Sequence, residues 1–163
     1  MRQSEAISSL FKERILLPPE SISNSLLGYL FFREKILETI LGDSEINILY
    51  WVGKEIGNSL EVKLIEEVED IFLQLDLGQV QIEAQSACTI DFKITHNRFN
   101  LIPKKRLEKT LNLEAGLLAG IMEKITETYC AAQLQINEKE GIYIGIEVVM
   151  DKSWNNHLVS HGV

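Results

Sequence analysis

The stretch from Asn112 to Cys130, NLEAGLLAGIMEKITETYC, most restricts how this chain can fold. Its apolar residues recur at four-residue steps, at Leu113, Leu117, Ile121, Ile125 and Tyr129. This spacing gives the wide apolar stripe of a helix that packs on a core. Asn112 is a residue type that favours the N-cap position, so we expect the helix to begin there.

Two glycines one turn apart, Gly116 and Gly120, lie inside this predicted helix. Each costs about 1 kcal/mol relative to alanine in a helix interior. The pair therefore predicts that another backbone lies close against that side. The sequence GKEIG repeats the spacing at Gly53 and Gly57, in a second predicted helix that runs from residue 43 or 44 to residue 58. We expect close backbone contact between the two helices, although local crowding alone would also explain the spacing.

The 163 residues are 45% hydrophobic, which fits one domain with a substantial core. A net charge of -8 argues against a general nucleic-acid or anionic-membrane binder. The two cysteines, Cys88 and Cys130, are far apart and form no metal-binding motif, so we expect reduced thiols in a cytoplasmic protein. The N-terminus lacks the pattern of a signal peptide, and no apolar run approaches the ~20 residues of a transmembrane segment.

The remaining hydrophobic pattern predicts helices first and strands later. Helices are expected over residues 23–41, 43–58 and 61–75, strands over 80–84, 90–94, 132–136 and 142–150, and a loop over 96–111. Each strand has one apolar face, which is typical of an antiparallel sheet covered on one side. We therefore predict an α+β fold, with a four-stranded antiparallel sheet, helices packed on one face, and the order ααα-ββ-α-ββ.

Three sequence segments resemble a known family. GYLFFREKILETILG, ILYWVGKEIG and LNLEAGLLAGIMEKI are similar to the YslB-like family of uncharacterised bacterial proteins. That family is grouped with the four-vinyl-reductase-type domains and the subunits of the TRAPP vesicle-tethering complex. The resemblance covers about Leu27 to Asp151. It divides the chain into an N-terminal extension (1–21), a single YslB-like α/β domain (22–151) and a C-terminal tail (152–163).

The resemblance implies a sandwich of helices on an antiparallel sheet, dimerisation through helices and, in some relatives, an apolar ligand between helices and sheet. The segment AGLLAG is similar to the Cys-Gly-x-x-x-Gly helix of the tethering subunits, with Ala115 in place of the cysteine. The reductase-type domains often carry cysteines around the last hairpin, whereas residues 134–149 have none. Covalent lipidation therefore does not transfer to this chain.

The candidate ligand site is apolar. Its predicted residues are Phe31, Arg33, Tyr50, Trp51, Gly53, Gly57, Gly116 and Gly120. The aromatic residues and the small glycine face can line a slot for a lipid-like or aromatic ligand, or they can fill a solid core. Arg33 can bind a ligand carboxylate. It can also reach solvent along its stem or pair with an internal acid such as Glu114.

Other polar residues carry weaker signals. His157 and His161 are four residues apart, but without a third ligand nearby we predict no metal site. His96 would need a partner to act as a general base. The basic residues between Lys104 and Lys109 can bind a phosphate or an acidic partner, or form a solvated loop. The chain has no Walker, GxGxxG, GxSxG or HExxH motif, and we predict neither a catalytic constellation nor a cofactor.

We therefore expect a non-enzymatic cytoplasmic binding or adaptor domain, a homodimer formed through helices, which holds a small apolar ligand between helices and sheet. One alternative is an enzyme that acts on a hydrophobic or tetrapyrrole-like substrate, which rests on fold analogy. Another is a structural subunit of a larger assembly, which an exposed apolar patch on the first two helices would favour.

Overall fold

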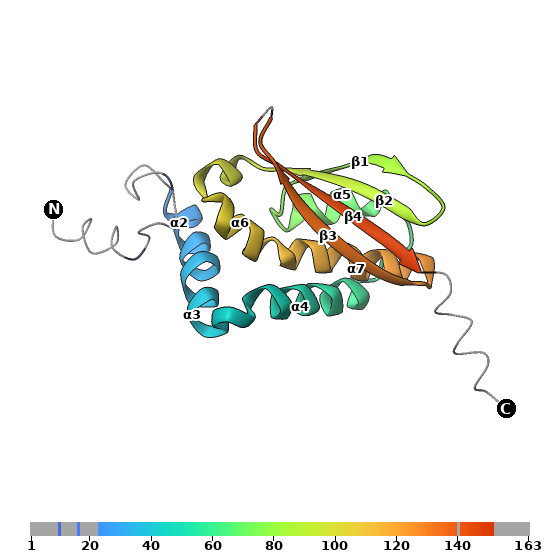
Figure 1. Cartoon of the computed structure of the whole chain (residues 1–163), viewed down its shortest axis with the longest axis horizontal. Coiled ribbons are helices and arrows are strands. Elements are labelled where there is room, and N and C mark those ends of the chain that lie inside the picture. Colours follow the sequence, from blue (N-terminus) through green and yellow to red (C-terminus); the bar gives the residue numbers. More distant parts are fainter. Residues whose placement is uncertain (1–9, 11–15, 17–22, 140, 152–163) are drawn as a thin grey trace.

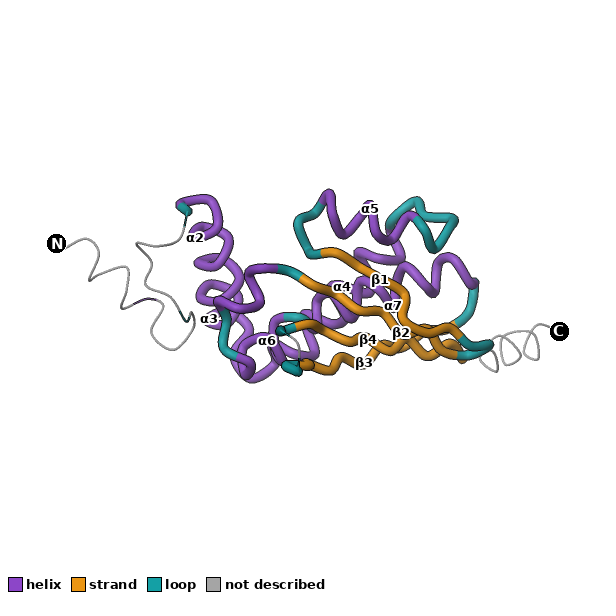
Figure 2. Tube along the Cα trace, turned by 90° about the horizontal axis from the view of Figure 1, so that it is seen from above, coloured by secondary structure: helices purple, strands orange, loops and turns teal. Residues whose placement is uncertain are grey.

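The chain folds as a layer of helices against one face of a four-stranded antiparallel sheet (Figures 1 and 2). The computed structural model describes residues 10, 16, 23–139 and 141–151. The predicted α+β class and the predicted order of helices and strands are confirmed. Apart from Leu10 and Leu16, the predicted extension and the tail, with His157 and His161, lie outside the described residues.

The helical elements are more numerous than predicted. They are α2 (Asn24–Leu30), the π-helical η2 (Phe31–Ile36), α3 (Leu37–Leu41), the 3-10 helix η3 (Gly42–Ser44), α4 (Glu45–Ser59), α5 (Glu67–Gln74), the 3-10 helix η4 (Asn97–Leu101), α6 (Lys104–Thr110) and α7 (Asn112–Thr126). The strands are β1 (Gln79–Gln85), β2 (Thr89–Thr95), β3 (Tyr129–Asn137) and β4 (Tyr143–Asp151).

Helix α5 begins six residues later than the predicted start at Glu61. The side chain of Glu67 explains the late start, because its Oε1 accepts the backbone N–H groups of Lys63 (3.1 Å) and Leu64 (2.8 Å). A carboxylate that binds free N–H groups next to a helix start stabilises that start. The residues before Glu67 are thereby held outside the helix.

Two boundaries around α7 also differ from the prediction. The predicted loop 96–111 contains α6, and the amide of Asn112 donates to the carbonyls of Glu108 (2.8 Å) and Lys109 (3.0 Å). The prediction that Asn112 caps α7 is therefore wrong, because its side chain binds the end of α6. Helix α7 ends at Thr126, and the left-handed Glu127 (φ 51°) turns the chain into β3.

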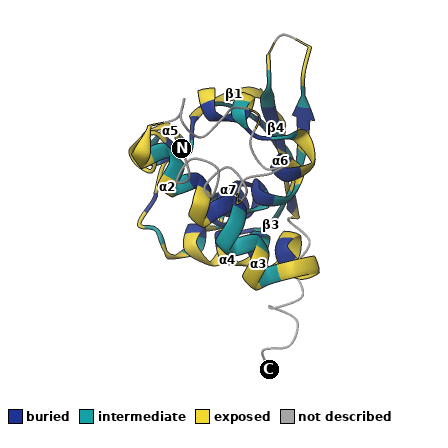
Figure 3. Ribbon diagram, turned by 90° about the vertical axis from the view of Figure 1, so that its left-hand side faces the viewer, coloured by how far each residue is buried: buried dark blue, intermediate teal, exposed yellow. Residues whose placement is uncertain are grey.

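The sheet has the strand order β1-β2-β4-β3, with every neighbouring pair antiparallel. Inward-facing residues of the two middle strands are almost completely buried, namely Ile90, Phe92, Ile94, Ile144, Ile146 and Val148. Leu118, Ile121 and Met122 of α7 belong to the same core cluster. Figure 3 shows the layered result, with α7 mostly buried and exposed surface on α3 and the outer side of α4.

Helix α4 packs against α7, and two of its side chains reach the edge strand β3. The hydroxyl of Tyr50 accepts the backbone N–H of Ala132 (2.9 Å), and Lys54 Nζ donates to the carbonyl of Cys130 (2.7 Å). Edge strands present unpaired backbone groups that must be satisfied or covered. Side chains of α4 therefore satisfy part of the outer edge of β3.

Candidate functional site

The glycine interface is the contact between α4 and α7 at Gly53, Gly57, Gly116 and Gly120. A Cβ added at Gly57 would lie 2.8 Å from the backbone N of Ile121, and one at Gly116 would lie 2.9 Å from the backbone N of Lys54. Added Cβ atoms at the other two glycines would also meet backbone atoms of the opposite helix. The predicted close approach of the two helices is confirmed. Glycine is required here because the facing atoms are backbone, which cannot rotate away.

The three aromatic residues of the predicted ligand set differ in how far they are buried. Tyr50 is half-buried over the edge of β3, whereas Phe31 and Trp51 are 39% and 58% exposed. Trp51 packs edge-on against Tyr50, with a ring centroid distance of 5.7 Å. The structure therefore gathers the four glycines in one helix contact and leaves two of the three aromatic residues at the surface. A ligand-binding role for this set stays a prediction.

Arg33 pairs with the internal acid that the sequence suggested. Its guanidinium forms a buried salt bridge with Glu114 and donates to the carbonyl of Thr110 (2.7 Å) and the hydroxyl of Tyr29 (2.9 Å). Burial alone would lower the pKa of Arg33, but the charge of Glu114 raises it above its usual value. Arg33 thus joins η2 to α7 as a permanently charged partner of Glu114.

A second buried cluster forms around Arg106, which the sequence placed in a basic loop. Its guanidinium donates to Glu34 Oε2 (3.0 Å) and forms a bidentate pair with Glu45, with both distances 2.9 Å. Burial raises the pKa of Glu34, although Arg106 opposes this effect. The other oxygen of Glu34 has no hydrogen-bond partner among the described residues. Arg106 therefore fastens η2 and α4 to α6.

His96 has both ring nitrogens engaged. Its Nδ1 accepts the backbone N–H of Arg98 (3.0 Å), so the proton of the neutral ring is on Nε2, which lies 3.1 Å from Asp76 Oδ1. A general base needs a free lone pair within reach of a substrate proton. His96 lines a shallow surface pocket together with Asp76 and Asn97. Because its ring is held by these two hydrogen bonds, His96 stabilises the local turn and does not have the geometry of a catalytic base.

A cleft opens between the C-terminal half of α7, the segment before α5 and the β1–β2 hairpin. Its volume is about 640 Å³. Its apolar lining consists of Leu64, Ile65, Ala87, Ile90, Met122, Ile125 and Met150. The cleft thus lies where the helical layer meets the sheet, at the end of the core away from α2 and α6 (Figure 1).

Two threonines bring polar atoms to the cleft. The hydroxyl of Thr126 donates to the carbonyl of Met122 (2.7 Å), and that of Thr128 donates to the carbonyl of Thr126 (3.1 Å). Because each proton is used in a backbone bond, the oxygens can act as acceptors toward a ligand. Lys63 lies exposed at the rim. Small-molecule sites are usually apolar hollows with a few polar groups. This cleft is open to solvent and its lining is mixed, because Glu66, Gln85 and Ser86 also contribute to it.

No residue of the predicted ligand set lines the cleft. Met122 and Ile125 were visible in the sequence only as members of the apolar stripe of α7. The hydrophobic pattern predicts a helix over residues 63–66, so the sequence does not indicate that these residues form a wall of the cleft. Within the described residues, no group of three metal-binding side chains occurs and no helix has the length and apolar character needed to cross a membrane.

Comparisons with known proteins agree with this architecture. A family described as "Protein of unknown function (DUF2507)" matches residues 26–148. The uncharacterized protein YslB of Bacillus subtilis (strain 168) is 20% identical over 136 residues, covering 83% of this chain and 88% of YslB.

A vinyl-4-reductase family protein from Methanocaldococcus jannaschii has a similar structure, with a TM-score of 0.53 and 23% identity, over 93% of this chain and 94% of that one. This likeness shows a shared fold. A structure from the H-NOX family aligns with a TM-score of 0.47 and 14% identity, over 91% of this chain and 86% of that one, which is too distant to support an argument.

Proposed function

We propose that this chain, which belongs to the DUF2507 family, is a non-enzymatic binding domain that holds a small apolar ligand in the cleft beside α7. The observation that carries the proposal is the cleft itself. Its volume of about 640 Å³ falls within the range of about 300–1,000 Å³ that is usual for ligand pockets. Two methionines of its wall, Met122 and Met150, are only 2% and 8% exposed. Methionine side chains are flexible, so they can move to admit apolar groups of different shape.

The lining defines the chemistry of the ligand. Aliphatic and thioether side chains favour an aromatic or short acyl group, because burial of apolar surface stabilises binding by roughly 25 cal/mol per Å². The hydroxyl oxygens of Thr126 and Thr128 offer hydrogen bonds to one donor group on the ligand. Lys63 and Glu66, which carry opposite charges, both line the cleft, so the rim favours neither sign of charge on the exposed end of the ligand.

The fluorescent probe N-phenyl-1-naphthylamine tests this proposal, because its emission rises when water is excluded. We expect saturable binding to the purified full chain. Leu64→Asp places a charge on the cleft wall at a residue that is already 61% exposed, and it should weaken binding about tenfold or more. Ile125→Trp should weaken binding by filling the cleft.

Leu75→Asp is the matched control, because Leu75 is 53% exposed and lies outside the cleft. It should bind the probe as the unmodified protein does. Equal loss of binding in both aspartate variants, with melting temperatures unchanged, would refute the assignment of the cleft.

The adaptor part of the proposal rests on the outer surface of α4. The α4 stripe consists of Ile48, Val52 and Ile56, four residues apart, with Trp51 beside them. These side chains are 40–58% exposed, although the opposite side of α4 already packs on α7. A helix that is apolar on two faces is suited to two packing partners. In this proposal, two copies of the chain dimerise through their α4 stripes.

Light scattering coupled to size-exclusion chromatography tests the dimer. We expect twice the chain mass for the unmodified protein and the monomer mass for Val52→Glu. Leu73→Glu, on an equally exposed apolar residue of α5, should remain dimeric (44% and 48% exposed, respectively). A monomeric unmodified protein at micromolar concentration would refute dimerisation.

One observation favours the structural-subunit alternative. Phe32 and Ile40, on η2 and α3, are 56% and 71% exposed and lie outside the α4 stripe. Exposed apolar residues beyond one interface suit a protein with a second partner. Under this alternative, the protein in fresh extract of the producing cells elutes above the dimer mass, and Ile40→Glu returns it to the mass of the purified protein.

A further inference from the structure

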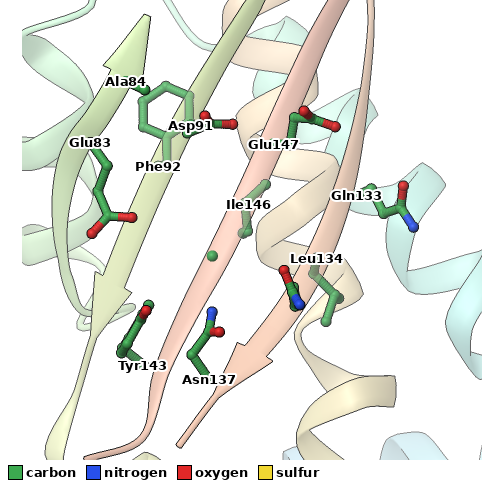
Figure 4. Close-up of a pocket in the computed structure, with 12 residues that line it drawn as sticks. Glu83, Ala84, Asp91, Phe92, Gln133, Leu134, Asn137, Tyr143, Ile146 and Glu147 are labelled. Atoms are coloured by element: carbon green, nitrogen blue, oxygen red, sulfur yellow. The ribbon is translucent and has the colours of Figure 1, made fainter. Parts of the chain in front are cut away.

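The sheet groove is a hollow on the face of the sheet that points away from the helices. Its volume is about 770 Å³ (Figure 4). Outward-facing side chains of all four strands line it, chiefly Glu83, Asp91, Gln133, Gln135, Tyr143 and Glu147. In the described part of the chain no helix covers this face, so these side chains meet solvent.

Gly145 forms the floor of the sheet groove. It lies between Lys93 of β2 and Gln135 of β3 in the strand register. A Cβ added there would meet Asn137 Nδ2 at 3.4 Å and the carbonyl of Gln135 at 3.7 Å, both near ordinary contact distance. Because glycine weakens a strand interior, a glycine that nothing presses against leaves a hollow for a group from outside.

Two acidic residues lie opposite each other in the strand register beside this floor. Asp91 of β2 is the register partner of Glu147 of β4. The N–H of Met150 donates to the carbonyl of Cys88 (2.7 Å), so these two residues are a hydrogen-bonded pair of the ladder. Hydrogen-bonded and non-hydrogen-bonded pairs alternate along antiparallel strands. This alternation makes Asp91 and Glu147 a non-hydrogen-bonded pair, in which opposite side chains come closest. Like charges in such a position destabilise a sheet.

Nearby cations do not relieve this repulsion. The ammonium of Lys93 lies 3.8 Å from Glu83 Oε1 and 4.4 Å from the centre of the Tyr143 ring, so it is directed away from the pair. No salt bridge of the described residues includes Asp91 or Glu147. A positive group placed between them from outside would convert a repulsive pair into two attractive contacts.

We propose that the sheet groove docks an extended basic segment of a partner protein, with one arginine or lysine side chain between Asp91 and Glu147. Gln133 is the register partner of Glu147 and Gln135 is that of Gly145. Their side-chain amides can both donate to and accept from a peptide backbone. The net charge of -8 attracts a basic partner over distance. This inference does not depend on the ligand cleft, which lies on the opposite side of the sheet.

Fluorescence polarisation with a labelled peptide of alternating glycine and arginine tests the proposal on the full chain. We expect saturable binding that weakens as salt rises. The same peptide with glutamate in place of arginine should not bind. The Asp91→Asn/Glu147→Gln double variant should bind about tenfold more weakly or worse, because charge-assisted hydrogen bonds are lost, while its melting temperature stays equal or rises because the repulsion is removed.

Two further variants separate docking from general charge attraction. Glu69→Gln/Asp70→Asn removes the same charge from exposed residues of α5 and should change the affinity less than about twofold. Gly145→Val fills the floor without changing charge, and should weaken binding while the sheet stays intact. Equal weakening by the α5 variant, full affinity in Gly145→Val, or displacement of the peptide by an equal concentration of spermidine would overturn the proposal.

Discussion

Replacement of Gly120 by alanine gives the sharpest test of the glycine interface. The added Cβ would lie 2.9 Å from the backbone N of Asn58 and 3.0 Å from the Cα of Gly57, with the carbonyl of Lys54 nearer still. All three atoms belong to the backbone of α4. The contact can be relieved only if the two helices move apart.

The expected loss follows from two opposing effects. Overpacking in a core costs about 1–3 kcal/mol, and backbone neighbours place this site at the upper end. Alanine in place of glycine in a helix returns about 1 kcal/mol. We therefore expect Gly120→Ala to lower the free energy of unfolding by about 2 kcal/mol. For a chain of this size, the melting temperature should fall by roughly 4–8 °C.

Urea unfolding followed by circular dichroism measures the effect. Gly28→Ala in α2 is the matched control, because a Cβ there would meet no atom within 4 Å. The same chemical change should then stabilise the protein by up to about 1 kcal/mol. Gly120→Ala with unchanged or increased stability would show that α4 and α7 do not touch through their backbones.

Three further predictions follow from the buried polar groups. Burial alone would raise the pKa of Glu123, but the hydrogen bond from the N–H of Cys130 and the ammonium of Lys54 lower it below 4.5. The ionised Glu123 therefore stabilises the fold above pH 4.5, and this stabilisation is lost as the pH falls below 4.5. Glu123→Gln should cost about 1 kcal/mol at pH 7 in urea titrations and progressively less below pH 4.5; a constant difference across pH would contradict this sign. Iodoacetamide should label the exposed Cys88 and spare Cys130, because Cys130 is fully buried and burial raises the pKa of its thiol. Two rapid additions in mass spectra of the intact protein would refute this prediction. Arg33→Met should destabilise the protein by about 3–5 kcal/mol, because Glu114 then keeps an unpaired buried charge. In thermal melts, the double variant Arg33→Met/Glu114→Leu should recover most of that loss. Equal losses in both variants would contradict this explanation.

Local repetition made much of the fold predictable. The four-residue period of α7, the glycine spacing in α4 and α7, and the alternation in β2 and β4 each record a burial pattern within a few neighbouring residues. In β1 the alternation misled, because a register shift after Ile82 leaves Ile82 44% exposed. For Arg33 the sequence left three roles open, namely a ligand carboxylate, solvent or an internal acid such as Glu114, and the structure shows the pair with Glu114.

Contacts between distant residues were not predictable. Arg106 lies in a basic segment that is typical of a solvated loop, yet its partners Glu34 and Glu45 are 72 and 61 residues away in the chain. Burial of Arg106 depends on how η2 and α4 meet α6. The cleft likewise depends on residues 63–66 leaving the helix, which the local hydrophobic period does not report.

Methionine methyl NMR measures directly whether an apolar ligand occupies the cleft beside α7. The chain has three methionines, and two of them, Met122 and Met150, line the cleft from α7 and β4. During titration with N-phenyl-1-naphthylamine, we expect both of these methyl signals to shift along one saturable binding curve. If the signals of Met122 and Met150 stay unchanged while the probe binds, the ligand lies elsewhere and the proposed cleft is wrong.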